Sequence, residues 1–220
     1  MGVVNITPDS FSDGGKFLER DQAIAHARRL AEEGADIVDL GGESTRPGAA
    51  PVSEAEEMQR VIPVLDKISD LCVSVDTRRP AVMRAALQAG ASMVNDVQAL
   101  QAPGALDAVR ESKCAVCLMH MKGEPATMQR EPHYDDVVRE VKDFLSARMH
   151  AAQDAGIARD RLVVDPGFGF GKTVEHNLTL LAHLEAFHDL GAPLLAGLSR
   201  KSTLGKLTGR PVAERLAGSL

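Results

Sequence analysis

Short aliphatic runs alternate with longer amphipathic stretches along the chain. The runs have the length of buried strands and lie at Gly2–Val4, Ile37–Leu40, Cys72–Val75, Ser92–Val94, Ala115–Met119, Leu162–Val164 and Leu194–Gly197. The stretches between them carry apolar residues at helical spacing, at about Asp21–Glu33, Glu54–Ile68, Pro80–Ala89, Ala105–Glu111, Tyr134–Ala155 and Val174–Phe187. This alternation predicts an α/β protein with a parallel sheet. No linker or change of composition divides the chain, so we expect one domain over residues 1–220.

Signals at the predicted helix ends agree with this pattern. Ser53 followed by Glu56 is a capping box that opens the second helix. Glycines near four helix ends predict left-handed backbone there, at Gly34, Gly90, Gly156 and Gly191.

Polar residues at the ends of the strands decide between an open sheet and a closed barrel. They are Asn5, Asp39, Asp76, Asn95, Asp96, His120, Asp165 and the cluster Ser199–Lys201. An open sheet gathers its ligand groups at one switch point, whereas a barrel brings all strand ends to one mouth. Polar ends on seven strands, about 32 residues apart on average, favour a (β/α)8 TIM barrel.

The strand count predicts an incomplete barrel. Seven strands are found, and Leu204–Leu220 has the pattern of a loop and a helix. The chain also begins directly at a strand. We therefore expect about seven of the eight βα units, with the barrel domain incomplete at its C-terminus and also at its N-terminus.

Composition excludes two classes of partner. The formal net charge is −6 and no run of Lys and Arg exceeds three residues, which argues against nucleic acid. No apolar stretch approaches the ~20 residues of a membrane helix, so no membrane partner is expected. Three cysteines are too few for a disulfide framework and favour the reducing cytoplasm.

Three polar strand ends suit a flat heterocycle. A ring with an amino-amidine edge, such as a pterin or guanine, needs carboxylate and amide partners. Asp76, Asn95 and Asp165 supply two carboxylates and one carboxamide, and each directly follows an apolar run. Any one of them alone is equally typical of a helix cap. After Asp165, Phe168 and Phe170 are placed to border such a ring.

Loops after other strands suit anions and a hard cation. Thr45 and Arg46, within Gly41–Gly48, offer a hydroxyl and a guanidinium for a phosphate or carboxylate. Ser199–Thr203 adds two cations and three hydroxyls at a helix start, and Lys201 is also able to bond a heterocycle carbonyl. Asn5 can offer its amide oxygen to Mg²⁺.

One apparent motif does not fit its family, and one choice between neighbouring residues stays open. Gly171-Lys-Thr173 fits the end of a phosphate-binding P-loop, but the first glycine of that motif would fall on Pro166. Either His120 or its neighbour Met119 would line the site.

Seven motifs together resemble the dihydropteroate synthase family: "NITPDSFSDGG", "DLGGESTRPGA", "VSVDTRRP", "VNDV", "CLMHMKGEP", "DPGFGFGK" and "GLSRKS". They lie in the family's order and cover nearly the whole chain. The resemblance implies a TIM barrel that uses Mg²⁺ and joins 6-hydroxymethyl-dihydropterin pyrophosphate to p-aminobenzoate. It also implies a homodimer for the full-length protein.

The resemblance assigns roles to single residues. Asp76, Asn95, Asp165 and Lys201 would hold the pterin, and Asn5 would ligate Mg²⁺ on the pyrophosphate. Arg46 and Thr45 would serve pyrophosphate and p-aminobenzoate, Ser202 would lie near the carboxylate of the latter, and Asp9 and Asp13 would lie on a mobile loop. Asp76, Lys201 and Arg46 are the expected catalytic residues. The reaction needs no enzyme nucleophile, and the sequence has no Ser-His-Asp or Cys-His arrangement.

One departure limits the resemblance. The family's eighth strand carries an Arg-x-His pair for pyrophosphate, and its dimer contact uses C-terminal helices; neither is found in these 220 residues. Two alternatives therefore remain. One is a pterin-binding barrel of the methyltransferase type, which has no use for the two anion loops. The other is an inactive binding fragment.

Overall fold

The structure is a computed structural model of the chain, and it describes residues 1–6, 16–44, 52–124 and 127–219. Six parallel strands form one sheet whose spatial order follows the sequence. They are β1 (Gly2–Asn5), β2 (Val38–Gly41), β3 (Val73–Asp76), β4 (Met93–Asp96), β5 (Ala115–Met119) and β6 (Leu162–Asp165). Parallel strands in sequential order, each followed by a helix, are the arrangement of a TIM barrel.

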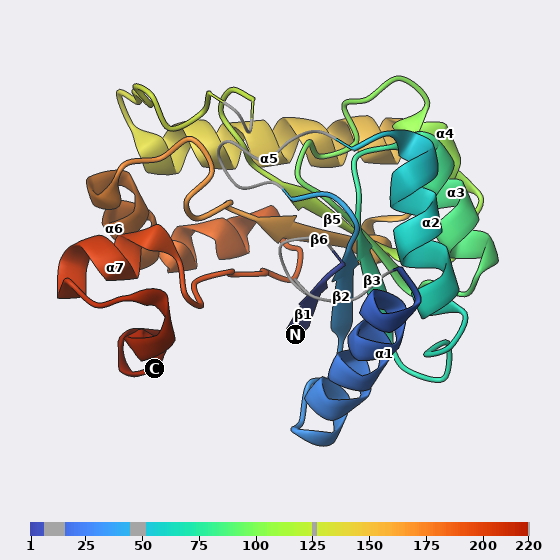
Figure 1. Ribbon diagram of the computed structural model, residues 1–220. Coiled ribbons are helices and arrows are strands. Elements are labelled where there is room, and N and C mark those ends of the chain that lie inside the picture. Colours follow the sequence, from blue (N-terminus) through green and yellow to red (C-terminus); the bar gives the residue numbers. More distant parts are fainter. Residues whose placement is uncertain (7–15, 45–51, 125–126, 220) are drawn as a thin grey trace.

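Helices cover the outer face of the curved sheet (Figure 1). The α-helices are α1 (Lys16–Glu32), α2 (Glu54–Leu65), α3 (Pro80–Gln88), α4 (Ala105–Arg110), α5 (Val137–Asp154), α6 (Val174–Ala182), α7 (Ser202–Thr208) and α8 (Leu216–Ser219). Short 3-10 helices are η2 (Arg159–Arg161), η3 (Leu184–Leu190) and η4 (Val212–Glu214). No helix in the described part of the chain is both long and apolar enough to span a membrane.

Two apolar clusters fill the space between sheet and helices. One joins β1–β3 to α1 and α2 through residues such as Val4, Leu40 and Val61. The other joins β4–β6 to α4 and α5 through residues such as Leu118 and Leu145. The opposite, inward face of the strands carries polar residues such as Asp39, Asp76 and Asn95.

The predicted helices exist, with shifts at their ends. The stretch predicted as one helix over Val174–Phe187 is divided, because α6 ends at Ala182 and η3 follows from Leu184. Ser53 Oγ accepts from Glu56 N at 3.2 Å, as expected of the N-cap. Gly34, Gly90, Gly156 and Gly191 all have positive φ, so that prediction is confirmed.

The count of seven strands was wrong. The segment predicted as the seventh strand makes only an isolated parallel bridge between Leu194 and Val164. Two hydrogen bonds hold it, from Val164 N to the Pro193 carbonyl and from Leu195 N to the Val164 carbonyl, each 2.9 Å. No described strand lies on its other side, and its pairing with β6 does not continue beyond this bridge.

Candidate active site

The register of the sheet brings the polar strand ends to one level. Asn5 pairs with Gly41, Gly41 with Asp76, Asp76 with Asn95, and Asn95 with Cys117. Paired residues of neighbouring parallel strands point to the same face, so these five positions form one row. Val4, next to Asn5, is fully buried under the helices, so the row faces the interior of the barrel. Asp76 and Asn95 therefore lie side by side, as the sequence predicted.

Asp39 lies one level below this row and was not assigned to the site from sequence. It is buried, and its Oδ2 accepts from Asn95 Nδ2 at 3.3 Å. Asp39 Oδ1, Ser74 Oγ and Asn95 Oδ1 are buried and have no hydrogen-bond partner among the described residues. Buried polar atoms are seldom left unpaired, so this group indicates a place for a polar ligand or water. Its sequence signal was a charged residue inside the aliphatic run Ile37–Leu40.

The carboxyl group of Asp76 is in an acidic environment. Burial, followed by the charges of Asp39 and Asp96, raises its pKa well above the usual value, while Lys201 opposes the shift. Burial also raises the pKa of Asp39. An ionised Asp76 is consequently favoured when a cation or a hydrogen-bond donor is near it.

Asp96 has a structural role. Its Oδ1 accepts from Gln98 N and its Oδ2 from Leu100 N, each at 2.8 Å. These bonds hold a turn in which Ala99 and Leu100 have positive φ, a conformation that costs energy in residues other than glycine. Because both carboxylate oxygens of Asp96 hold this turn, Asn95 is the residue of the pair that is placed to bind a ligand.

Asp165 ends β6 one level above the row, because Cys117 pairs with Val163, and Met119, the next inward residue of β5, pairs with Asp165. Its Oδ1 accepts from Gly167 N at 2.7 Å. Burial raises its pKa to about 6, against the opposing effects of that bond and of two lysines, Lys201 and Lys172. A buried carboxylate with a free second oxygen is suited to a ligand with N–H donors.

Lys201 and Phe170 meet above Asp165. Lys201 Nζ lies 4.5 Å from the centroid of the Phe170 ring, within cation–π range. Burial lowers the pKa of Lys201, while the charges of Asp165 and Asp76 raise it. The predicted group of Asp76, Asp165, Phe170 and Lys201 is thus brought together by the fold.

Asn5 reaches the same mouth from β1. It is exposed, and a Cβ built on Gly41 would lie 3.4 Å from Asn5 Oδ1 and 3.9 Å from Asp76 Oδ2. The glycine therefore leaves room for these two oxygen-bearing side chains on either side of it.

The choice between His120 and Met119 is settled by the contacts of His120. The His120 ring packs edge-on against Phe144 of α5, with 4.9 Å between centroids, and its Nδ1 lies 2.9 Å from Lys172 Nζ. His120 thus lies beneath the β6–α6 loop, whereas Met119 is in register with Asp165. Lys172 was missed from sequence, because it stands within a motif that resembles the end of a P-loop.

The structure does not test the predicted roles of several residues. Thr45, Arg46, Asp9 and Asp13 lie outside the described residues. Ser202 is the exposed first residue of α7, close to the mouth in sequence through Lys201. The position of Ser202 relative to p-aminobenzoate stays a prediction.

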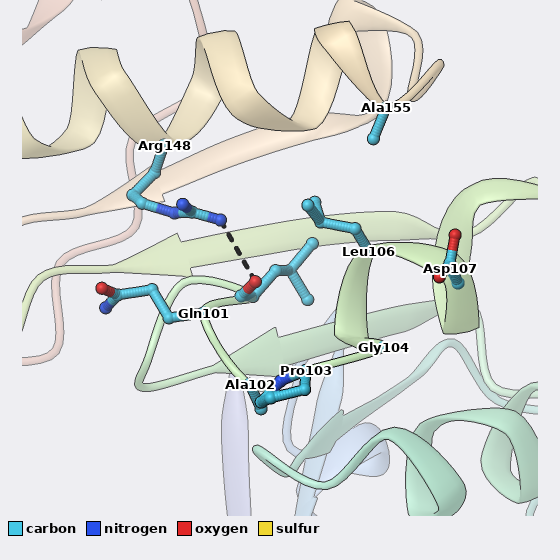
Figure 2. A pocket seen from close by; sticks show the side chains of 9 residues that line it. Gln101, Ala102, Pro103, Gly104, Leu106, Asp107, Arg148 and Ala155 are labelled. Carbon is cyan, nitrogen blue, oxygen red and sulfur yellow. Dashed lines mark hydrogen bonds between the residues drawn. The ribbon is translucent and has the colours of Figure 1, made fainter.

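The mouth is distinct from a hollow elsewhere among the described residues. That hollow, of about 450 Å³, lies between the β4–α4 loop and α5 (Figure 2). Its Arg148 donates from Nη2 to the Leu100 carbonyl at 3.1 Å. None of the predicted site residues lines it.

Asp76 and Asn95 in one row inside a parallel barrel sheet, with Asp165 and Lys201 near them, indicate a class, the pterin-binding barrel enzymes. In agreement, a family model described as "Pterin binding enzyme" matches residues 1–220. The dihydropteroate synthase of Escherichia coli K12 is 51% identical over all of this chain and 79% of its own length.

Solved structures are similar over the same span. The Xanthomonas albilineans dihydropteroate synthase with 4-aminobenzoic acid has a TM-score of 0.94 and 57% identity, covering 100% of this chain and 80% of that one. The same enzyme in complex with 7,8-dihydropteroate has a TM-score of 0.90 and 54% identity, covering 100% and 79%. The chain belongs to the dihydropteroate synthase family, and it spans about four-fifths of these relatives. This favours the synthase over a methyltransferase-type barrel.

Proposed function

We propose that the barrel mouth binds 6-hydroxymethyl-7,8-dihydropterin pyrophosphate and p-aminobenzoate and joins them into 7,8-dihydropteroate, with release of pyrophosphate. The observation that carries the proposal is the interior row with Asp76 and Asn95, beneath Asp165 and Lys201. Relatives with 4-aminobenzoic acid and with 7,8-dihydropteroate bind molecules of this chemistry.

The pterin edge complements these four side chains. Its amino and ring N–H groups are donors for the carboxylates of Asp165 and Asp76, and its carbonyl is an acceptor for Lys201. Asn95 offers both a donor and an acceptor, and its Oδ1 has no hydrogen-bond partner in the described part of the chain. Binding of a donor-rich ring would also favour the ionised state of Asp76, whose pKa is raised by burial and by its acidic neighbours.

The transfer breaks the bond between the pterin methylene carbon and the pyrophosphate oxygen. The amine nitrogen of p-aminobenzoate forms the new bond to that carbon and loses a proton. Positive charge develops on the pterin side, where Asp76 and Asp165 lie, and negative charge on the departing pyrophosphate. Charges fixed in advance around a buried site stabilise such a transition state without a covalent enzyme intermediate.

Mg²⁺ fits the residues of the mouth if pyrophosphate supplies most of its ligands. Among the described residues, no group of three His, Cys, Asp or Glu side chains is arranged to hold a metal. Asn5 offers one amide oxygen beside Gly41, and Mg²⁺ commonly takes one or two protein ligands together with water and substrate phosphates. When bound, Mg²⁺ would neutralise charge on the leaving group.

The remaining assignments rest on the sequence motifs. Arg46 and Thr45 would assist pyrophosphate and p-aminobenzoate, and Ser202 would contact the carboxylate of the latter. A homodimer of the full-length protein and a cytoplasmic location belong to the same proposal. The three free cysteines are compatible with that location.

The direct test is release of pyrophosphate on mixing the chain with both substrates and Mg²⁺. We expect release that requires p-aminobenzoate and stops when excess chelator has removed divalent cations. Pterin binding without release would favour the alternative of an inactive binding fragment. Release that continues at full rate without any divalent cation would remove Mg²⁺ and the role of Asn5 from the proposal.

A further inference from the structure

Lys172 is a buried lysine without a carboxylate partner in the described part of the chain. It is 3% exposed. Its Nζ donates to His120 Nδ1 at 2.9 Å, to the Gly167 carbonyl at 2.9 Å and to the Phe170 carbonyl at 3.0 Å. A buried charge is expensive unless it is paired or fully hydrogen-bonded, and here backbone carbonyls and one imidazole take that part. A fourth, longer bond goes to the His120 carbonyl at 3.4 Å, so all four go to the end of β5 or to the loop after β6.

These bonds connect Lys172 with the residues proposed to hold the pterin. Gly167, which accepts from Lys172 through its carbonyl, donates its N–H to Asp165 Oδ1 at 2.7 Å. Phe170, which also accepts from Lys172, places its ring 4.5 Å from Lys201 Nζ. Lys172 therefore bonds directly to Phe170 and is connected to Asp165 through Gly167.

The loop lies directly on the backbone that follows β5. A Cβ added to Gly167 would stand 1.9 Å from the His120 carbonyl oxygen, and one added to Gly171 would stand 2.2 Å from the Lys122 carbonyl oxygen. His120 N also donates to the Asp165 carbonyl at 2.9 Å. Lys172 therefore lies where the two segments pack together, and its ammonium group adds hydrogen bonds to both of them.

We propose that Lys172 is a positioning residue for pterin binding: its ammonium group fixes the Gly167–Phe170 backbone, and so holds Asp165 and Phe170 in the geometry that receives the ring. This inference rests on the proposed function of the mouth. Lys172 does not touch the pterin itself. Its effect therefore concerns the affinity for pterin and leaves the anion loops unchanged.

Electrostatics make the role testable by pH. Burial lowers the pKa of Lys172 to about 7, although Asp165 opposes the shift, and burial raises the pKa of Asp165 to about 6. Asp165 must be ionised and Lys172 protonated for the strongest binding. Pterin affinity of the unmodified chain should consequently rise as pH increases through about 6 and fall above about 7. The other titratable groups near Lys172 are His120 after β5, with a pKa of about 3, Lys122, Lys201, and His176 of α6, whose pKa is lowered by burial. Tyr134 and Glu140 face His120.

The test compares Lys172→Met with the unmodified chain by calorimetric titration of the pterin pyrophosphate without p-aminobenzoate. Methionine keeps the length and removes the donors. We expect the dissociation constant at pH 6.5 to rise roughly tenfold or more, since two charge-assisted bonds to the loop are lost. The decline of affinity above pH ~7 should disappear in the variant, while binding of inorganic pyrophosphate should change less than about twofold. Lys113→Met, at an exposed lysine before β5, is the matched control and should match the unmodified chain.

The outcomes separate this inference from the function on which it rests. If the unmodified chain does not bind the pterin, the proposed function fails. If it binds and Lys172→Met has the same affinity and the same pH profile, only the positioning role is overturned. Equal losses for pterin and pyrophosphate would also overturn it, because they indicate general damage. If the variant fails to fold, the pH profile of pterin affinity of the unmodified chain serves as the test. A constant pterin affinity between pH ~6.5 and ~8.5 would contradict the role of the ammonium group.

Discussion

The carboxylate of Asp165 combines burial, one backbone hydrogen bond and two nearby lysines at the end of β6. A pterin N–H bonded to it would form a charge-assisted bond worth ~1.5–3 kcal/mol. In Asp165→Asn, the amide can still accept from Gly167 N, but its NH2 group would face a donor of the ligand. We expect pterin affinity to fall by roughly tenfold or more, as measured by titration.

The pH dependence of stability gives this substitution a second readout. The folded pKa of Asp165, about 6, is raised above the unfolded value. The folded state therefore binds more protons than the unfolded state between pH ~4 and ~6, and the contribution to stability is lost as pH rises through about 6. Asp165→Asn should be no less stable than the unmodified chain at pH ~7.5 in a thermal melt. Asp160→Asn, at an exposed aspartate before the same strand, is the control and should change neither pterin affinity nor stability. Unchanged pterin affinity in Asp165→Asn would remove Asp165 from the site.

At the scale of elements, the β6–α6 loop packs against the segment after β5 through glycine backbone. Gly167 has φ of +68°, and its added Cβ would meet the His120 carbonyl oxygen. Gly104 has φ of +83° at the N-cap of α4, but nothing lies within 4 Å of its added Cβ. Replacing either glycine by alanine would thus carry the conformational cost of a positive φ. Only at Gly167 would the added Cβ also clash with a neighbouring atom.

We expect Gly104→Ala to lower the free energy of unfolding by about 1 kcal/mol, the cost of a left-handed alanine. Gly167→Ala adds an overpacking cost and should lose roughly 2–4 kcal/mol, together with pterin binding. Urea unfolding of both variants measures the difference. Equal losses would show that the loop can move away from His120 without cost, in which case close packing does not determine its position.

At the scale of the whole molecule, the described sheet has two edges. β1 pairs only with β2, and Val3 on its inward side is 51% exposed. At the other edge, the segment around Leu194 is joined to β6 by one bridge. β3 and β4 are paired on both sides and buried in the apolar clusters.

Hydrogen exchange of the 220-residue chain should therefore be graded across the sheet. Amides of β1 and of the Leu194 segment should exchange first, and those of β3 and β4 last, because edge strands open with less loss of buried contacts. Mass spectrometry of peptides from these segments measures the order. Uniform protection from β1 to β6 would show that the chain opens only as a whole and that its edges are covered, for example by self-association.

The sequence predicted single residues best where chemistry and element boundaries coincide. Asp76, Asn95 and Asp165 were assigned because each polar residue follows an apolar run, and the register then placed Asp76 and Asn95 in one row. Asp39 was noted as a polar residue in an aliphatic run but was not assigned to the site, since the sequence alone does not show that the neighbouring strands bury it beside Asn95. Lys172 was missed for a similar reason, because no local pattern marks a lysine whose partners are carbonyls of a folded loop.

Local patterning by itself determined the class of the fold, because the two periods of hydrophobic residues specify which segments are strands and which are helices. It also determined the chemical inventory of the strand ends. Only the tertiary structure decided which of those ends face one ligand, since burial and register depend on partners distant in sequence. The seventh aliphatic run shows the limit: Leu194–Gly197 has the composition of a strand, but a strand forms only as far as its neighbours supply hydrogen-bond partners.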